Sequence, residues 1–266
     1  MRAFDRDFRG VQIGRCEACG VLAMNPQYSE GHLARFYASY ISVDDQDRGD
    51  HVEGSRKHPE IRRIGKRRSL QLMASYIEPG RLLSVGSGDG LELGIAKDLG
   101  WEVEGYDVDP ATTGEVSARF DVPVHSGAFE DLERPDGWFD AVFMDQVLEH
   151  LKQPRRYLDK IARLLRPGGV LFLGVPNIGS FSNRLKTASG RLGLRRRRRG
   201  KHYASKHHIL YFTPAVLRDL LQRQYDFEIL TLRGSLKPQH KPLTARLSRW
   251  LPSLDSGMLA VARRRA

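Results

Sequence analysis

Three glycines and one carboxylate form the most informative chemical pattern in the sequence. Gly86, Gly88 and Gly90 follow a short apolar run, and glycines let a backbone turn tightly and approach a ligand without a Cβ in the way. Asp107 comes after a second apolar run. An ionised carboxylate only accepts hydrogen bonds, and it can take both hydroxyls of a ribose. The pattern therefore indicates a nucleoside-binding site.

These residues need a strand, a turn, a helix and a second strand to position them. The apolar residues predict a strand over 82–85, a helix starting at Leu91 and a strand over 102–106. Open α/β sheets bind ligands at the carboxyl ends of their strands, where Asp107 would lie. Further strands are expected near 122–125, 139–144, 170–175, 227–232 and 258–262. The sequence thus predicts an α/β fold.

Several segments together resemble the class I S-adenosylmethionine-dependent methyltransferases. The turn has G-x-G-x-G spacing, without the later glycine of dinucleotide sites. Residues 139–177 contain an Asp-Ala-Val strand, a Leu-Glu-His-Leu turn and an Arg-Pro-Gly-Gly turn in the family's order. The C-x-x-C-G segment at 16–20 and residues 208–214 are similar to the branch acting on sugars, glycan precursors and other small metabolites. The resemblance implies a Rossmann-like, seven-stranded, mostly parallel sheet with an antiparallel last strand.

The resemblance also implies S-adenosylmethionine as the cofactor and a set of residues that bind it. The expected cofactor-binding residues are Gly86, Ser87, Gly88, Gly90, Asp107, Val108, Phe129, Glu130, Asp145 and Gln146. A hydroxyl or carbon-acid acceptor needs a base, and imidazole suits this role because its pKa lies near working pH. His150 and His208 are the expected catalytic residues. A capping or core role for His150 stays open.

Three positions depart from the family's pattern. Ser84 stands where the family usually has an acidic residue, and Ser87 stands where cysteine is frequent. Ala128 replaces a carboxylate often found near the adenine, which leaves Glu130 as the nearest acid. These changes keep open a non-catalytic scaffold that has lost the cofactor.

Cys16 and Cys19 are the only cysteines in the chain. A structural zinc site needs four ligands, and the sequence has no second cysteine pair to supply them. The spacing of His32 and His51 does not argue that they complete a site. We therefore expect no metal and interpret the pair as the remnant of a zinc knuckle, with zinc binding and redox chemistry as alternatives.

Positive charge is concentrated in one segment of a chain whose net charge is +11. Residues 184–208 contain ten Lys or Arg residues and no Asp or Glu, and Arg195 to Arg199 are consecutive arginines. This composition predicts a mobile loop at the arginine run. The segment that carries His208 resembles the family's substrate lid, and we expect the long basic lid insertion over 176–214 to place His208 and Tyr211 over the pocket. The expected partner is an anionic small molecule or glycan precursor, phosphorylated or lipid-linked, with contact to an acidic membrane surface. A solvated insertion without a partner is the alternative.

The expected organisation is an N-terminal appendage over 1–57 and a methyltransferase domain over 58–266. No apolar run reaches the eighteen or so residues of a membrane span, and the N-terminus lacks an apolar signal-peptide core, so a cytoplasmic location is expected. An RNA methyltransferase using the basic segment stays open, although few aromatic residues are available there to stack on bases.

Overall fold

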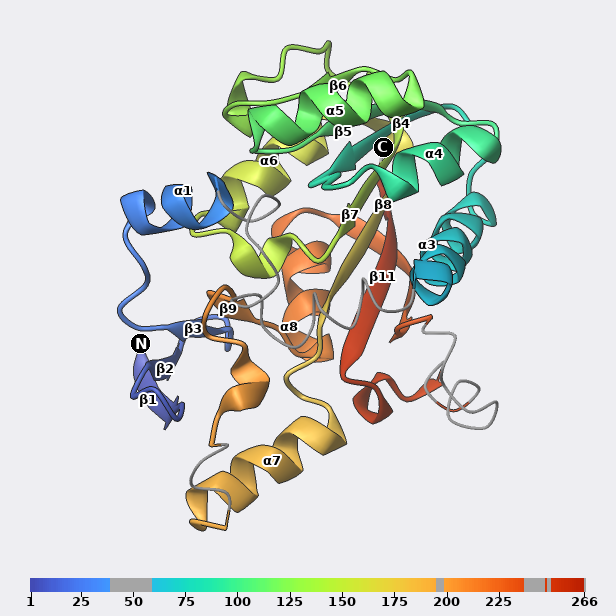
Figure 1. The fold of residues 1–266 in the computed structure, drawn as a ribbon. Helices are drawn as coiled ribbons and strands as arrows, with labels where there is room; N and C mark the ends of the chain where they lie inside the picture. The colour runs from blue at the N-terminus through green and yellow to red at the C-terminus, as the bar shows by residue number, and fades with distance from the viewer. Residues whose placement is uncertain (39–58, 195–198, 237–246, 248–249, 266) are drawn as a thin grey trace.

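The computed structural model describes residues 1–38, 59–194, 199–236, 247 and 250–265, and a seven-stranded sheet lies at its centre (Figure 1). The strand order is β10-β11-β8-β7-β4-β5-β6. The strands are β4 (Arg81–Val85), β5 (Glu102–Tyr106), β6 (Val124–His125), β7 (Phe139–Asp145), β8 (Leu165–Pro176), β10 (Phe227–Gly234) and β11 (Gly257–Arg264). Strand β11 is antiparallel to both neighbours, whereas the pairs from β8 to β6 are parallel. The predicted Rossmann-like fold is confirmed.

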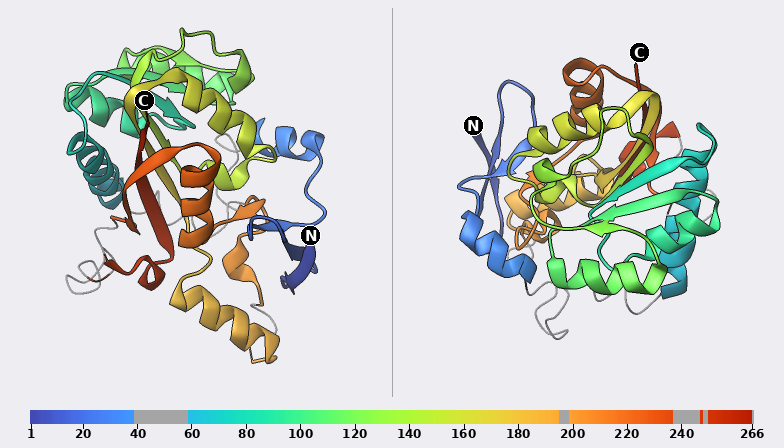
Figure 2. Two further views of the ribbon diagram at one scale, coloured as in Figure 1. Left: turned by 180° about the vertical axis from the view of Figure 1, so that it is seen from behind. Right: turned by 90° about the horizontal axis from the view of Figure 1, so that it is seen from above.

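Helices cover both faces of this sheet, as the views from behind and above show (Figure 2). The helices along the chain are α1 (Glu30–Ala38), α3 (Pro59–Ala74), α4 (Leu91–Asp98), α5 (Pro110–Phe120), α6 (Pro154–Leu164), α7 (Phe181–Arg191) and α8 (Pro214–Asp219), which continues into a π turn over Leu220–Gln224. Single 3-10 turns span Phe129–Asp131, Leu148–His150, Lys201–Tyr203 and Pro252–Leu254. The local sequence determines where α5, α7 and α8 begin, since the side chains of their N-cap residues Asp109, Ser180 and Thr213 accept hydrogen bonds from the first turn of each helix.

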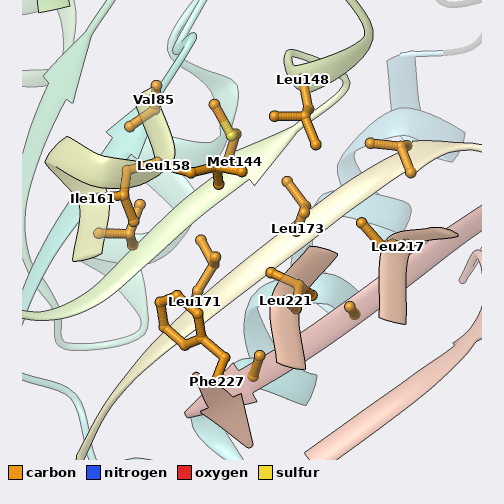
Figure 3. Packing of buried hydrophobic residues seen from close by; sticks show 14 of the residues in the cluster. Val85, Met144, Leu148, Leu158, Ile161, Leu171, Leu173, Leu217, Leu221 and Phe227 are labelled. Carbon is orange, nitrogen blue, oxygen red and sulfur yellow. The ribbon is translucent and has the colours of Figure 1, made fainter. Parts of the chain in front are cut away.

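Side chains alternate between two cores across the sheet. On β8, Leu171 and Leu173 pack with α6 and α8, whereas Phe172 packs with α3 and α4 on the other face. Figure 3 shows the first of these cores, with Leu217 and Leu221 of the α8 region beside β8. Burying both faces of the sheet fixes the register of its strands, and so fixes the edge where their carboxyl ends meet.

A second sheet joins the N-terminal residues to the segment before α8. It has the order β1 (Arg2–Arg6), β2 (Gln12–Arg15), β3 (Leu22–Met24) and β9 (Leu210–Tyr211). Its small core includes the fully buried Tyr203, whose hydroxyl donates to Asp5 at 2.9 Å. The N-terminal strands and the 199–212 segment therefore stabilise each other.

Helix α7 occupies the first part of the expected basic lid insertion, and it extends away from the central sheet (Figure 1). Residues 195–198 of the arginine run lie outside the described residues. Arg199 pairs with Asp5 at 3.0 Å, and Arg191 donates to the Phe4 carbonyl at 2.6 Å. Two cations of the segment thus attach it to strand β1. Among the described helices, none is both long enough and apolar enough to cross a bilayer.

Candidate active site

The glycine turn lies at the carboxyl end of β4. Gly86, Gly88 and Gly90 have positive φ angles of 76°, 50° and 74°, a conformation that other residues adopt at a cost. An added Cβ would clash with Val147 at Gly86 and with Val116 at Gly90, whereas none of the described atoms lies within 4 Å of a Cβ at Gly88. The outer glycines are needed for packing, and Gly88 is the place where a ligand can approach the backbone.

Asp107 follows β5 and faces this turn. Its Oδ2 accepts a hydrogen bond from the Gly88 N–H at 2.8 Å, and its Oδ1 accepts one from the Asp109 N–H at 3.2 Å. Burial raises the pKa of Asp107, while these backbone hydrogen bonds act in the opposite direction. Each carboxylate oxygen has a second acceptor site, so the group can still bind a ribose.

A charged network beneath the turn compensates for the absent acid at Ser84. The Ser84 hydroxyl donates to Glu92 Oε1 at 3.3 Å, and Glu92 is buried on α4. Lys66 Nζ of α3 lies 3.5 Å from Glu92 Oε2 and 3.0 Å from Asp145 Oδ2. Glu92 of α4 therefore supplies a carboxylate next to Ser84 of β4, where the family usually has an acidic residue. The hydroxyl of Ser87 is buried and makes no hydrogen bond within the described part of the chain.

Lys66 and Glu92 were not predicted from the sequence. Burial opposes the charge of Lys66, but Asp145 and Glu92 raise its pKa, whereas burial raises the pKa of Glu92. One turn earlier on α3, Arg62 donates to Asp89 of the glycine turn, with Nη2 and Oδ1 2.6 Å apart. The i, i+4 spacing of the two cations is the sequence signal that indicates one basic helix face.

Three further residues that are expected to bind the cofactor differ in how exposed their side chains are. Val108 and Glu130 have exposed side chains at the carboxyl edge of β5 and in the turn after β6. Phe129 is fully buried, with its ring centroid 4.8 Å from those of Tyr106 and Tyr157. The Phe129 side chain is thus part of the core and presents no surface to a ligand.

Strand β7 ends in Asp145 and the exposed Gln146, which has a positive φ of 63°. The Gln146 N–H donates to the Gly174 carbonyl of β8 at 2.8 Å. A Cβ at Gly174 would clash with the Asp145 carboxylate, so glycine gives this carboxylate space. Asp145 is turned toward Lys66, and Gln146 remains accessible at the edge of the sheet.

Both predicted catalytic histidines lie in one cluster just beyond β7. The Nε2 atoms of His150 and His208 each lie 3.9 Å from Glu149 Oε1. His150 Nδ1 lies 3.0 Å from the His207 carbonyl, to which it donates. The rings of His150 and His208 meet edge to face, with centroids 4.9 Å apart. The structure therefore brings together residues that are far apart in the sequence.

Burial controls the charges of this cluster. Desolvation, followed by the nearby His207, lowers the pKa of His150 to about 3. Desolvation raises the pKa of Glu149 to about 8, and the charge of Asp145 adds to the shift. His150 is consequently a neutral imidazole, which can accept a proton or bind a cation. Glu149 was not predicted as a site residue, because a carboxylate in a turn gives no sign of its burial.

Backbone hydrogen bonds hold the His208 segment over the end of β7. The Ile209 N–H donates to the Glu149 carbonyl at 2.8 Å, and the Ile178 N–H donates to the Phe212 carbonyl at 3.0 Å. The expectation that Tyr211 faces the pocket is wrong: its side chain is buried in the N-terminal sheet's core, with its ring centroid 5.3 Å from that of Tyr203. Strand pairing with β3 places the Tyr211 ring in that core, and its hydroxyl donates to the His208 carbonyl at 3.0 Å.

The two cysteines lie in the turn between β2 and β3. Backbone bonds close this turn, since the Cys16 N–H donates to Val21 at 2.9 Å. Hydrogen bonds from the Cys19 and Ala18 backbone to the thiol lower the pKa of Cys16, whereas burial raises the pKa of Cys19. Within the described ranges, no third His, Cys, Asp or Glu gathers with the pair. His32 instead stacks on Tyr28, and His51 lies outside the described residues.

Residues 57–232 match a family model described as a methyltransferase domain. The chain belongs to this methyltransferase family. It is 36% identical over 102 residues to a probable S-adenosylmethionine-dependent methyltransferase of Mycolicibacterium smegmatis, covering 38% of this chain and 40% of the relative. It is 39% identical over 109 residues to a ubiquinone biosynthesis O-methyltransferase of Xanthomonas campestris pv. campestris strain B100, covering 37% and 44%. The chain thus spans less than half the length of these curated relatives.

A solved methyltransferase also shares the fold. The 1,6-didemethyltoxoflavin-N1-methyltransferase of Burkholderia thailandensis, solved with 1,6-didemethyltoxoflavin and S-adenosylhomocysteine, gives a TM-score of 0.58 at 16% identity over the whole of both chains. The predicted enzyme class and cofactor are confirmed by the family match and the named S-adenosylmethionine-dependent relatives. The individual site residues and the acceptor stay predictions.

Proposed function

We propose that this methyltransferase transfers the methyl group of S-adenosylmethionine to an anionic, lipid-linked small molecule or glycan precursor at a membrane surface. Asp107 and the Gly88 backbone would hold the ribose, which places the sulfonium near the carboxyl ends of β4 and β7. The cofactor is already activated, so alignment and exclusion of water account for much of the catalysis. The histidine cluster, defined as Glu149, His150 and His208, would handle the acceptor's proton.

The proposed transfer is a direct displacement. A lone pair of the acceptor forms the new bond to the methyl carbon while the C–S bond pair remains on sulfur, which leaves S-adenosylhomocysteine. The acceptor's proton goes to the histidine cluster or to water beside it. The position of His208 beside Glu149, just beyond β7, supports this role. The lowered pKa of His150 makes it the weaker base of the two.

The observation that carries the acceptor proposal is an exposed apolar face on α7. Phe181, Leu185, Ala188 and Leu192 follow at i, i+4, i+7 and i+11, which places them on one helix face. The side chains of Phe181, Leu185 and Leu192 are 68%, 60% and 76% exposed, respectively. We call these four residues the α7 stripe. Exposed apolar side chains in such a row are typical of an interaction surface.

The charge around the α7 stripe supports an anionic bilayer as the surface that it binds. Arg184 and Arg191 are exposed beside it, and the 184–208 segment contains no acidic residue. A helix with an apolar face and flanking cations lies in the membrane interface, where each Lys or Arg near an anionic leaflet contributes about 1 kcal/mol. Because α7 follows the carboxyl end of β8, a membrane-bound acceptor would arrive at the edge where the cofactor binds.

Vesicle flotation tests this proposal. The protein should float with phosphatidylcholine vesicles that contain phosphatidylglycerol and much less with phosphatidylcholine alone. Burying Phe181 and Leu185 contributes about 1.5–3 kcal/mol each, so the Phe181→Ser, Leu185→Ser double variant should bind at least tenfold more weakly. Ile64→Ser, which replaces an exposed residue of α3, is the matched control and should bind normally.

Two results would contradict the membrane-surface proposal. One is equal vesicle binding by the unchanged protein and the Phe181→Ser, Leu185→Ser variant. The other is RNA binding with a steep salt dependence that the same substitutions leave intact, which would favour the RNA methyltransferase. Each variant is first shown to bind S-adenosylmethionine normally, so that loss of folding is not mistaken for loss of membrane affinity.

A further inference from the structure

We propose that Glu149, His150 and His208 bind a divalent transition-metal ion, with Zn²⁺ as the best match. One ligand atom from each residue lies within 4.8 Å of the other two. The inference rests on the proposed methyl transfer for its purpose, since the ion would hold an oxygen of the acceptor. It replaces the expectation from the sequence that the chain binds no metal.

The buried carboxylate of Glu149 carries the inference. The residue is 0% exposed, and neither Oε1 nor Oε2 has a hydrogen-bond partner within the described residues. A buried carboxylate is normally hydrogen-bonded, paired with a charge or bound to a metal, because desolvating it alone is costly. The two imidazole Nε2 atoms at 3.9 Å are too far for hydrogen bonds. A cation between the three groups would compensate for this burial.

The distances are close to those of a shared ion. Zinc binds nitrogen at about 2.0–2.1 Å and carboxylate oxygen at about 2.0–2.2 Å, so two ligands of a tetrahedral site lie about 3.4 Å apart. The two contacts of Glu149 Oε1 with the imidazoles are 3.9 Å, and all three ligand atoms lie within 4.8 Å of one another. Binding an ion would therefore draw the two imidazoles closer to Glu149.

The surroundings of His150 match those of a metal ligand. Its Nδ1 donates to the His207 carbonyl at 3.0 Å, and a histidine ligand usually donates its second ring nitrogen to a carbonyl or carboxylate in this way. The bond directs Nε2 toward Glu149. The Ile209 N–H to Glu149 carbonyl bond fixes the segment that carries His208, so the ligands from both segments are held by main-chain contacts.

Two imidazoles and one carboxylate leave at least one open position on the ion. A hydroxyl or phosphate oxygen of the acceptor could occupy that position. A metal-bound hydroxyl has a lowered pKa, so its proton would be released to water before the oxygen attacks the methyl group. The inference therefore favours an oxygen acceptor and assigns His150 and His208 to holding the ion.

Calorimetric titration with Zn²⁺ tests the site in protein freed of metal by a chelator. Because Cys16 and Cys19 can also bind zinc, the titration uses the full chain with Cys16→Ser and Cys19→Ser. One equivalent should bind in this background. Adding Glu149→Gln or His208→Ala should weaken binding at least a hundredfold, and adding His32→Ala, which changes an exposed histidine of α1, should not.

Bound Co²⁺ provides a second readout, since its visible absorption reports nitrogen and oxygen ligands and should disappear with His208→Ala. Zinc binding that is lost with the two cysteines, or that His208→Ala and His208→Asn both leave intact, would overturn the inference. Titration with S-adenosylmethionine separates this outcome from failure of the proposed function. A chain that binds the cofactor without binding Zn²⁺ or Co²⁺ would refute the metal site alone.

Discussion

The Asp107 carboxylate accepts a hydrogen bond from the Gly88 N–H at 2.8 Å, which joins the expected ribose acceptor to the one turn glycine with open space above it. Val85 pairs with Tyr106 in the neighbouring parallel strands β4 and β5. Asp107 and the glycine turn that follow these strands therefore lie at the same edge of the sheet. The register of β4 and β5 thus positions the carboxylate beside the glycine turn.

Asp107→Ala should weaken the binding of S-adenosylmethionine more than tenfold. Two ribose hydroxyls would lose an ionised acceptor, and each charge-assisted hydrogen bond contributes about 1.5–3 kcal/mol. Isothermal titration calorimetry measures the change, with Asp98→Ala at the exposed end of α4 as the control. An Asp107→Ala variant with unchanged cofactor affinity would remove this residue from the site.

Gly88→Ala should mainly weaken cofactor binding, whereas Gly90→Ala should mainly reduce the stability of the fold. At Gly90 the new methyl group would meet Val116, so overpacking of about 1–3 kcal/mol adds to a left-handed strain of about 1–2 kcal/mol. At Gly88 only the strain applies, and the methyl group would stand where the ligand approaches. Urea unfolding should show the larger loss for Gly90→Ala. Calorimetry of Gly88→Ala should show weaker cofactor binding, and the reverse ranking in stability would contradict the packing roles.

Lys66→Met should reduce the free energy of unfolding by about 3–5 kcal/mol, the cost of removing one partner from a buried ion pair. The substitution leaves Glu92 and Asp145 without the cation that lies 3.5 Å and 3.0 Å from them. Adding Glu92→Gln should recover part of the loss, because it removes one of the buried carboxylates. Urea unfolding of the single and double variants forms a double-mutant cycle, and purely additive losses would show that the pair is not coupled.

Glu104 should make the stability depend on acid pH. Burial opposes its ionisation, but His125 Nε2 at 2.8 Å and the Arg134 guanidinium at 2.8 Å lower its pKa to about 2. Because the pKa in the folded protein lies below the ordinary glutamate value of 4.5, the stabilisation by the ionised carboxylate is complete above that pH. It is lost as the pH falls from about 4.5 toward 2.

Glu104→Gln should therefore cost about 1–3 kcal/mol at pH 7 and progressively less as the pH falls below about 4.5. Unfolding in urea at neutral and acid pH measures this difference. Glu102→Gln changes an exposed carboxylate of the same strand and should show no comparable pH dependence. A cost for Glu104→Gln that stays constant with pH would contradict the role of the ion pair.

The central sheet could be predicted because its signals are local. The apolar residues of β8 alternate between two cores, and the glycine turn follows β4 directly. The pairing of β9 with β3 had no such signal, since it joins two-residue and three-residue strands from distant parts of the chain. That contact depends on tertiary packing around Tyr203, and it also determines where Tyr211 points.

In the candidate site, too, the residues with local sequence signals could be predicted, and those that depend on tertiary packing could not. The closeness of Asp107 and Gly88 could be predicted because both follow consecutive parallel strands. The burial of Glu149 without a hydrogen-bond partner among the described residues could not, because a turn of mixed residues does not reveal burial. Lys66 depends on how α3 packs against α4, and Phe129 packs into the core because Tyr106 and Tyr157 enclose its ring.

Calorimetric titration of the unchanged protein with S-adenosylmethionine and with S-adenosylhomocysteine tests the central claim most directly. We expect one saturable site for each ligand on every chain, competition between the two ligands, and a higher unfolding temperature with either one bound. No heat of binding and no shift in unfolding temperature at millimolar ligand would contradict it. That result would identify the chain as a scaffold that has kept the fold and lost the cofactor.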